Sequence, residues 1–408
     1  MAGKSINWKY LVAQDRVKEI LSSAFLSGNL AHAYLLCGDE GVGKFAAALD
    51  MAMALLCTTE GNVPCGICSS CKRILNFNHP DLHIVLPIPL KPGFQTDDGL
   101  TERGWKYIAD KIQAKIANPY LPLTFELEES DSGEKDDDKI AKTDRYKVPI
   151  IPIDLLREVD HAILRGSVEG KSNITIFYDI DVMVEKSQNA MLKTLEEPPA
   201  NTYLFLTTCK PELILPTIYS RCQIVRFGHV PPNQVQKELM GSLGSEIDSE
   251  KIKDAVYYSM GSLGRALTLI KTETTIKGSK TLEETSDEVK DFWNVCCSGN
   301  WQEIGPAVDV LVRDKNLAVH DQFFSYMLYL IRNSFLQKMG SSENYIDADN
   351  ILPDPCGLLN DPGATARLTY ACNEALISVR KYGNLGIIYV NFVMTLMEIL
   401  HVEKQQAC

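Results

Sequence analysis

Residues 38–45 read Gly38-Asp39-Glu40-Gly41-Val42-Gly43-Lys44-Phe45, between a short apolar run, residues 33–37, and an Ala-, Leu- and Met-rich segment with a helical pattern, residues 44–56. Seven of these eight positions match a P-loop, Gly-x-x-x-x-Gly-Lys-Ser/Thr, whose glycines turn backbone N–H groups toward a phosphate. The stretch therefore predicts a phosphate loop between a strand and a helix. A glycine-rich turn without a ligand is the alternative. The candidate nucleotide-binding residues of this loop are Gly38, Gly41, Gly43 and Lys44.

Two positions depart from a working ATP site. A P-loop normally continues with a Ser or Thr that binds Mg²⁺, and the ring of Phe45 cannot coordinate a metal. A hydrolysing P-loop ATPase also places Asp-Glu after a later strand, where Glu polarises the attacking water. Here Asp179 suits the metal position, but Ile180 occupies that of the base, and Asp181 is shorter and one residue out of place. We predict that hydrolysis is absent or feeble, and leave open whether ATP or ADP binds.

Apolar runs that alternate with helical segments indicate a parallel sheet covered on both faces. The runs cover residues 33–37, 82–86, 174–178 and 203–207. After Pro231-Pro232 the strand signals stop, and residues 235–243, 249–259 and 264–271 have the pattern of short helices. The chain is helical in pattern from about residue 282 onward. We predict an α/β P-loop domain over residues 1–227, a small helical domain over residues 228–275 and an all-α domain over residues 280–408.

Residues 87–149 are rich in Pro, Gly and acidic side chains, and we interpret them as an irregular acidic insertion. Residues 127–143 within it have the composition of a disordered or mobile loop. Eight acidic residues and one lysine fall in residues 126–138, a local charge of −7 out of a total of 41 − 53 = −12. This balance excludes a protein that coats DNA through a basic surface, although a small basic face stays open.

The beginning of the sequence has no apolar core of a signal peptide, and the longest apolar stretch, residues 385–400, is interrupted by Asn391 and Glu398. We expect a cytoplasmic protein with no membrane partner. Disulfides are disfavoured there, so four clustered cysteines indicate a metal site. Their spacing, Cys57-x7-Cys65-x2-Cys68-x2-Cys71, suits a closed tetrahedral Zn²⁺ site, with free thiols or an iron–sulfur cluster as the alternatives.

Further motifs resemble those of bacterial DNA polymerase III clamp-loader subunits, which are AAA+ proteins. Residues 189–199 read NAMLKTLEEPP and are similar to their NALLKTLEEPP segment. Ser220-Arg221-Cys222 matches their Ser-Arg-Cys motif, and His32-Ala33-Tyr34-Leu35 resembles the run before their P-loop. The resemblance covers residues 5 to about 270. It implies a RecA-like AAA+ domain with a zinc module over residues 57–71, a helical lid, and a collar that joins five subunits into a ring.

In this family the resemblance implies partners and residue roles. The partners would be the γ/τ and δ subunits of a hetero-pentameric ring, with the β sliding clamp and primer-template DNA reached through the complex. Arg221 would act in trans as an arginine finger, and Asp179 and Thr208 would lie at the nucleotide. The lid arginine that should face the γ-phosphate would stand at Gly264, one place before Arg265.

These departures favour the δ′ branch, because the γ/τ motor subunits keep Thr after the lysine and Asp-Glu after the strand. An active γ/τ-type ATPase is the alternative. A small-molecule kinase that uses only the P-loop is a third hypothesis, but it would not need the Ser-Arg-Cys motif, the cysteine cluster or an all-helical third domain.

Overall fold

The computed structural model describes most of the chain and divides it into two compact units, residues 1–271 and 272–408. The described residues are 5–89, 94–96, 99–123, 149–243, 252–253, 255–256, 259–271, 282–314, 317–340, 351–354, 357–380 and 384–406.

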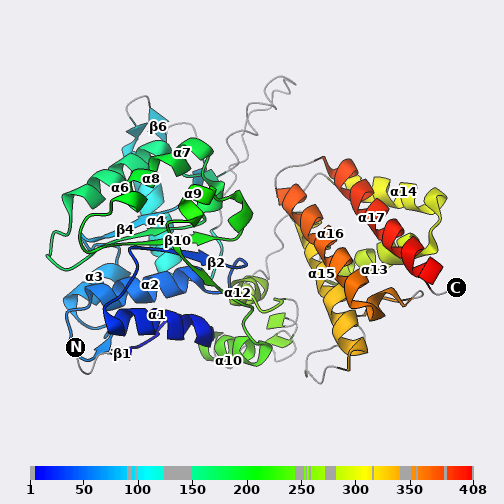
Figure 1. Ribbon diagram of the computed structural model, residues 1–408, viewed down its shortest axis with the longest axis horizontal. Helices are drawn as coiled ribbons and strands as arrows, with labels where there is room; N and C mark the ends of the chain where they lie inside the picture. The colour runs from blue at the N-terminus through cyan, green and yellow to red at the C-terminus, as the bar shows by residue number, and fades with distance from the viewer. Residues whose placement is uncertain are drawn as a thin grey trace. The chain divides into compact units, whose positions relative to one another are not determined.

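The first unit is built on a sheet of five parallel strands in the order β11-β2-β10-β9-β4 (Figure 1). Their bounds are β2 Ala33–Cys37, β4 Leu82–Val85, β9 Asn173–Phe177, β10 Thr202–Thr208 and β11 Gln223–Arg226. The four predicted strands are confirmed to within one residue at each end. The edge strand β11 was not predicted, because it has only two apolar residues, Ile224 and Val225, between the polar Gln223 and Arg226.

One face of the sheet is covered by α2 (Lys44–Leu56), with α1 (Asp15–Ser27) and α3 (Ser69–Leu75) on the same side (Figure 1). Nearly every residue of α2 is buried, because the helix lies between the sheet and these neighbours. A helix with apolar side chains on nearly all sides is stable only in such a position. The short parallel pair β1 (Ser5–Ile6) and β3 (Asn62–Val63) joins the N-terminal segment to the chain that follows α2.

The other face is covered by α6, α7 and α8 (Figure 1). The bounds are α6 Ile153–Arg165, α7 Glu185–Ala190, α8 Leu192–Glu196 and α9 Pro216–Tyr219. The short 3₁₀ turns η2 (Ile180–Val182) and η3 (Pro211–Leu213) follow strands β9 and β10. The motif at residues 189–199 therefore spans the end of α7, all of α8 and the turn into β10.

The prediction of an irregular stretch over residues 87–149 was wrong for its described first half. That half contains α4 (Glu102–Ala117), whose start is capped by the Thr101 side chain accepting from the Gly104 N–H. Isoleucines 108, 112 and 116 repeat at helical spacing and pack into the main core, which is the amphipathic signal that the Pro- and Gly-rich flanks obscured.

The two ends of this insertion are joined by β5 (Ile88–Pro89), which pairs antiparallel with β8 (Pro149–Ile150). A second short pair, β6 (Gln95–Thr96) and β7 (Gly99–Leu100), precedes α4. The predicted disordered part, residues 127–143, lies outside the described residues.

The segment predicted as a small helical domain belongs to the first unit. It contains α10 (Pro232–Leu243) and α12 (Leu263–Lys271), and most of the predicted helix between them lies outside the described residues. Val230, Val235, Leu239, Leu263 and Ala266 form a separate small core with Ala46 of α2 and Tyr120 of the insertion. This core ties the helical segment to the P-loop side of the sheet.

The second unit contains only helices among its described residues, as predicted from about residue 282 onward. They are α13 (Leu282–Ser298), α14 (Trp301–Arg313), α15 (Leu317–Lys338), the 3₁₀ turn η4 (Leu358–Asn360), α16 (Pro362–Arg380) and α17 (Leu385–Gln406). Its core is aromatic, with Phe324 within 5.5 Å of Phe392 and 4.9 Å of Tyr389 between ring centroids.

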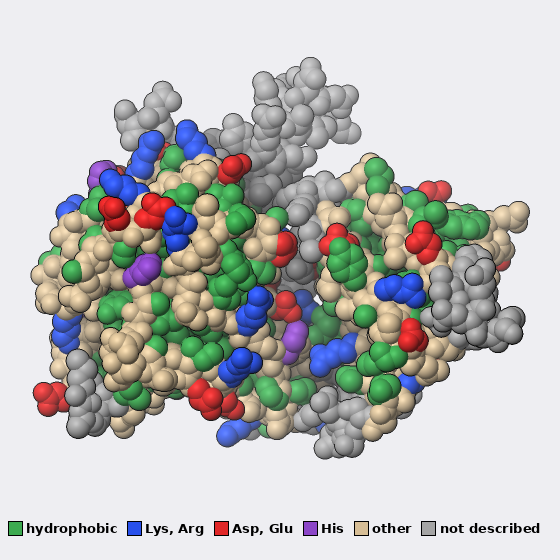
Figure 2. Space-filling model, in the orientation of Figure 1, with side chains coloured by type: hydrophobic (Ala, Val, Ile, Leu, Met, Phe, Trp, Pro, Cys, Tyr) green, Lys and Arg blue, Asp and Glu red, His purple; other side chains and the backbone are tan. Residues whose placement is uncertain are grey.

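Among the helices of the described residues, none combines the length and apolar character needed to cross a membrane. Figure 2 shows acidic and basic side chains interspersed on the visible face of the first unit. That face has no single basic field, in keeping with the charge balance of the sequence.

The N-terminal segment is fixed to α2 by one buried carboxylate. Asp50 is completely buried and accepts the backbone N–H groups of Lys9 (3.2 Å), Tyr10 (3.0 Å) and Leu11 (2.9 Å). Burial nevertheless raises the pKa of Asp50 to about 6, against the lowering effect of these hydrogen bonds. The folded chain therefore holds a proton on Asp50 more tightly than the unfolded chain does.

We predict that Asp50 makes the first unit less stable as pH rises from about 4 to about 6. In this window the folded state binds more protons than the unfolded state, so the free energy of unfolding falls, by an amount on the order of 2–3 kcal/mol. Asp50→Asn should remove the Asp50 share of this slope and leave that of Asp179, whose pKa is also raised, whereas Glu19→Gln, at an exposed position of α1, should keep the whole slope. Chemical denaturation at a series of pH values measures the difference, and an unchanged slope in Asp50→Asn would contradict the assignment.

Candidate functional site

The P-loop lies at the carboxyl end of β2, where ligands bind in open parallel sheets. Gly41 and Gly43 have φ angles of 75° and 107°, which side chains rarely adopt. A Cβ atom on Gly41 would collide with the Ser262 side chain, and one on Gly43 would approach the Tyr120 hydroxyl to 2.9 Å. The glycines are thus required by the loop, as predicted, and also by protein groups that pack directly on it.

Lys44 is 5% exposed and points back into its own loop. Its Nζ atom donates to the carbonyl oxygens of Gly38 (2.6 Å) and Asp39 (2.7 Å) and lies 3.2 Å from the Cys209 sulfur. An ammonium group has three hydrogens, so these three contacts use its full donor capacity. In this arrangement the lysine supplies hydrogen bonds to carbonyl oxygens of the loop backbone.

Phe45 is 2% exposed, and its ring meets that of Tyr178 edge-on at 5.8 Å between centroids. The ammonium group of Lys115 lies 5.5 Å from the Phe45 ring centre and 4.4 Å from that of Tyr178. It donates to the Leu121 carbonyl (2.6 Å) and the Tyr178 hydroxyl (3.2 Å). A cation from the insertion is therefore buried beside the position that normally supplies the magnesium-binding hydroxyl.

The acidic residues after β9 lie at the same edge of the sheet. Burial raises the pKa of Asp179 to about 7, although the Lys44 ammonium opposes this. Ile180 is fully buried, so no carboxylate occupies the position of the base. Asp181 accepts from the Thr208 hydroxyl (2.7 Å) and the Cys209 N–H (3.2 Å), which joins the end of β10 to the turn after β9.

The helical segment contacts the loop through two of its described residues, Ser262 and Gly264. The Gly264 N–H donates to the Gly41 carbonyl (3.0 Å), and the Ser262 hydroxyl donates to the Glu40 carbonyl (2.7 Å). A side chain at Gly264 would collide with the Tyr120 carbonyl oxygen and with Gly41 Cα. The position at which the resemblance expects an arginine therefore admits only glycine in this structure.

Sequence reasoning missed Lys115 and Tyr120, the two insertion residues at the site. Tyr120 is 7% exposed and accepts the Val12 N–H at 2.7 Å. A signal for Lys115 does exist in the sequence, because it stands on the same helical face as Ile108 and Ile112. A lysine at a core position of an amphipathic helix is an informative exception, since burying an ammonium group requires partners.

The four clustered cysteines come together as predicted. Their sulfur atoms all lie within 4.8 Å of one another, with Cys57 3.9 Å from Cys68 and Cys65 4.0 Å from Cys71. Hydrogen bonds from Thr59 and nearby backbone N–H groups lower the pKa of Cys65 to about 7. Burial raises the pKa of Cys71, so the cluster is a compact set of sulfur donors whose thiolate character is uneven.

Arg221 lies at the end of α9, away from the P-loop of its own chain. Its guanidinium pairs with Glu196 of α8 at 2.6 Å and donates to the Thr217 carbonyl at 2.9 Å. About one third of the side chain is exposed. The predicted site residues therefore form three groups, and only the P-loop residues, Asp179 and Thr208 share one site.

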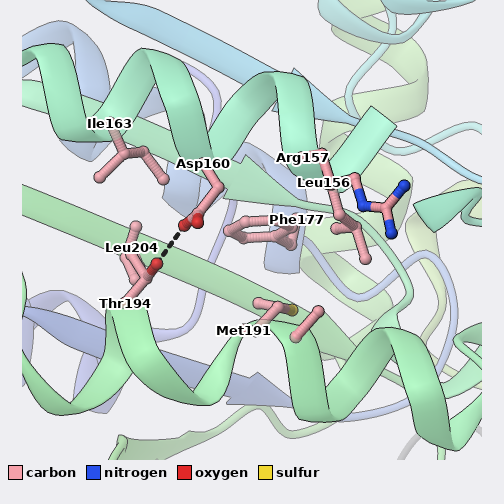
Figure 3. A pocket seen from close by; sticks show the side chains of 9 residues that line it. Leu156, Arg157, Asp160, Ile163, Phe177, Met191, Thr194 and Leu204 are labelled. Carbon is pink, nitrogen blue, oxygen red and sulfur yellow. Dashed lines mark hydrogen bonds between the residues drawn. The ribbon is translucent and has the colours of Figure 1, made fainter. Parts of the chain in front are cut away.

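A small cavity on the opposite face of the sheet is separate from these sites (Figure 3). It lies between α6 and the α7–α8 pair, and its lining is mainly apolar. Within it Thr194 donates a hydrogen bond to Asp160, which joins α8 to α6. The lining includes Leu156, Ile163, Phe177, Met191 and Leu204.

The fold and the site define a P-loop protein of the parallel α/β class whose phosphate loop lacks the usual metal-binding hydroxyl and the usual base. The chain belongs to the family described as DNA polymerase III, delta subunit, whose model matches residues 13–231. This match covers more than half of the chain and confirms the resemblance to clamp-loader subunits.

Individual relatives point in the same direction. DNA polymerase III subunit delta′ of Bacillus subtilis is 30% identical over 237 residues, 58% of this chain and 54% of that protein. Subunit delta′ of Haemophilus influenzae is 24% identical over 67% of this chain and 63% of that protein. Subunit tau of Salmonella typhimurium is 25% identical over 58% of this chain and 28% of that protein. The chain therefore spans little more than half the length of the delta′ relatives, and the match to them supports the δ′ type.

Proposed function

We propose that this chain is a δ′-type subunit of the DNA polymerase III clamp loader that supports loading of the β sliding clamp onto primed DNA without hydrolysing ATP itself. The observation that carries the proposal is a P-loop on a chain of this family with Phe45 at the metal position and buried Ile180 at the position of the base. A subunit with these residues can assemble with ATPases but lacks groups for turnover.

The alternatives are less well supported. A γ/τ-type motor needs a hydroxyl group after Lys44 and a carboxylate at position 180. This chain has Phe45 and Ile180 there, and the neighbouring carboxylate of Asp181 is already hydrogen bonded to Thr208. A small-molecule kinase needs an open phosphate site, whereas Gly264 lies on Gly41. The proposed role also implies a RecA-like AAA+ domain, a lid and a collar, and a cytoplasmic location.

Partner capture together with an ATPase assay tests this proposal. The full chain should capture γ/τ and δ subunits of its own organism and form with them a complex of defined stoichiometry, while the isolated chain should show no DNA-stimulated ATP hydrolysis. The expected hetero-pentamer can be weighed by native mass spectrometry. Turnover by the isolated chain near the ~1 s⁻¹ lower end of common enzyme rates would favour the γ/τ-type motor, and failure to capture either partner would contradict the role.

The proposal includes Arg221 as a finger for the ATP site of a neighbouring subunit. In the free chain the guanidinium is held by Glu196, so assembly would exchange this surface pair for a phosphate oxygen. Such an exchange is inexpensive, because exposed ion pairs contribute about 0–1 kcal/mol. Arginine fingers in related P-loop systems contribute about 10³ to 10⁵ in rate.

We predict that Arg221→Ala leaves partner capture intact and lowers the ATPase rate and clamp loading of the reconstituted complex by about tenfold or more. Arg221→Lys should recover little, because an ammonium cannot replace the planar fork of donors. Arg226→Ala removes another exposed arginine of the same region, one bonded to Tyr219, and should have no effect. Equal clamp-loading rates for Arg221→Ala and Arg226→Ala would exclude the finger.

The cysteine cluster would hold one structural Zn²⁺. Four sulfur atoms about 2.3 Å from a tetrahedral ion lie about 3.8 Å from one another, close to the 3.9 Å separation of Cys57 from Cys68 and the 4.0 Å separation of Cys65 from Cys71. The cluster has four protein ligands, so no position is left for a catalytic water. Zinc would join the end of α2, through Cys57, to the start of α3, through Cys71.

We predict one zinc ion per chain, measured by native mass spectrometry. Cys68→Ala should abolish binding and loosen residues 57–75 locally, because metal binding contributes folding free energy where the ligands are. The remaining sheet should keep its cooperative unfolding, since its core does not depend on the module. Cys222→Ala is the matched control outside the cluster and should retain the metal. Zinc retained after removal of both Cys65 and Cys68 would contradict the site.

A further inference from the structure

We infer that residues 115–121 of the insertion form an internal plug that occupies the P-loop site and keeps nucleotides out of it. The inference rests on the proposed function, since a plugged site suits a subunit that does not hydrolyse ATP. It assigns a function to the insertion, for which the sequence suggested none.

The first contact of the plug is at the metal position. In a P-loop site Mg²⁺ lies between the residue after the lysine and the acidic residue after the later strand. Lys115 enters this region from α4 and lies against the rings of Phe45 and Tyr178, the residue before Asp179. Only 3% of Lys115 is exposed. A buried ammonium group here supplies positive charge near Asp179 without a metal ion.

The second contact is made by Tyr120. Its side chain packs on Gly43 and its carbonyl oxygen lies against Gly264, so it stands between the loop and the helical segment. Its hydroxyl accepts the Val12 N–H at 2.7 Å. It shares a buried core with Ala13, Ala46 and Val230. The space between the P-loop, the N-terminal segment and α12 is therefore filled by protein.

The third observation is that the Lys44 ammonium and two carbonyl oxygens of the loop already have protein partners. Lys44 donates to two carbonyl oxygens of its loop, and Gly264 and Ser262 are hydrogen bonded to the loop backbone. A phosphate that binds Lys44 would have to draw its ammonium group away from these carbonyl oxygens and displace the plug as well. A nucleotide could enter only at the expense of buried polar and aromatic contacts, which makes exclusion the stable state.

The two ends of the insertion lie close together, so it can be excised, and the excision also removes the α4 isoleucines from the main core. Pro89 of β5 pairs directly with Pro149 of β8, and paired residues of antiparallel strands are about 5 Å apart. A short Gly-Ser linker can therefore replace residues 90–148 without stretching the chain. A second, smaller variant, Lys115→Ala with Tyr120→Ala, removes the two plugging side chains and keeps α4, whose isoleucines belong to the main core.

The test is isothermal titration of the full chain with ADP, combined with hydrogen exchange of the P-loop amides. The unmodified chain should bind no ADP at millimolar concentration, and both variants should bind it at least about tenfold more tightly than that limit, with slower exchange of residues 41–45. The control Lys106→Ala with Tyr107→Ala changes a lysine and a tyrosine of α4, of which Tyr107 packs on Phe94, and should behave like the unmodified chain.

Binding of ADP by the unmodified chain, with protection of the P-loop amides, would overturn the plug. So would the absence of binding in both variants if they unfold cooperatively, because the loop would then be closed by its own contacts. Capture of γ/τ and δ subunits is measured separately on the same proteins. If the unmodified chain captures neither subunit, the clamp-loader role is refuted. The nucleotide-binding result does not depend on that outcome.

Discussion

A P-loop places a lysine and an aspartate in a buried position, and their charges must be neutralised by something. Phosphate and Mg²⁺ do this in an ATPase, whereas protein groups do it here. Lys44 gives its hydrogens to carbonyl oxygens of its own loop, and burial raises the pKa of Asp179 to about 7, so that carboxyl carries only part of its charge at neutral pH. The second lysine, Lys115, adds positive charge at the same edge of the sheet. The helical segment and the insertion both contact this part of the molecule, through Gly264 and through Lys115.

The sequence was sufficient for the features that arise from local pattern. Four strands, the P-loop and the cysteine cluster follow from apolar runs, glycine spacing and ligand spacing, and the structure confirms them. The losses at Phe45 and Ile180 could also be inferred, because they concern residue chemistry at known places in a motif. The edge strand β11 was missed because half of its residues face solvent, which leaves a pattern too short to distinguish from a turn.

The contacts of the insertion were beyond sequence reasoning for a different reason. Lys115 and Tyr120 reach residues 45, 178, 12 and 43, so their partners are distant in the chain and are brought together only by tertiary packing. Pattern reasoning could have identified Lys115 as an anomaly on an apolar helical face, but not what it touches. In the same way the Ser-Arg-Cys motif suggests a role for Arg221, while its pairing with Glu196 could not be read from a spacing of 25 residues.

A P-loop without ATP turnover, as we propose for this chain, would still have a mechanical use in this fold. Gly41 allows the backbone of Gly264 to approach closely enough for a hydrogen bond, and Gly43 leaves room for Tyr120. In a motor subunit the corresponding space between loop and lid is bridged by nucleotide, so the angle between the two elements changes with the nucleotide state. Here Tyr120 of the same chain lies between the loop and the helical segment, against Gly43 and Gly264. The same glycine geometry that evolved around a phosphate would therefore hold the helical segment in one orientation, which suits a subunit whose neighbours move and which itself remains rigid.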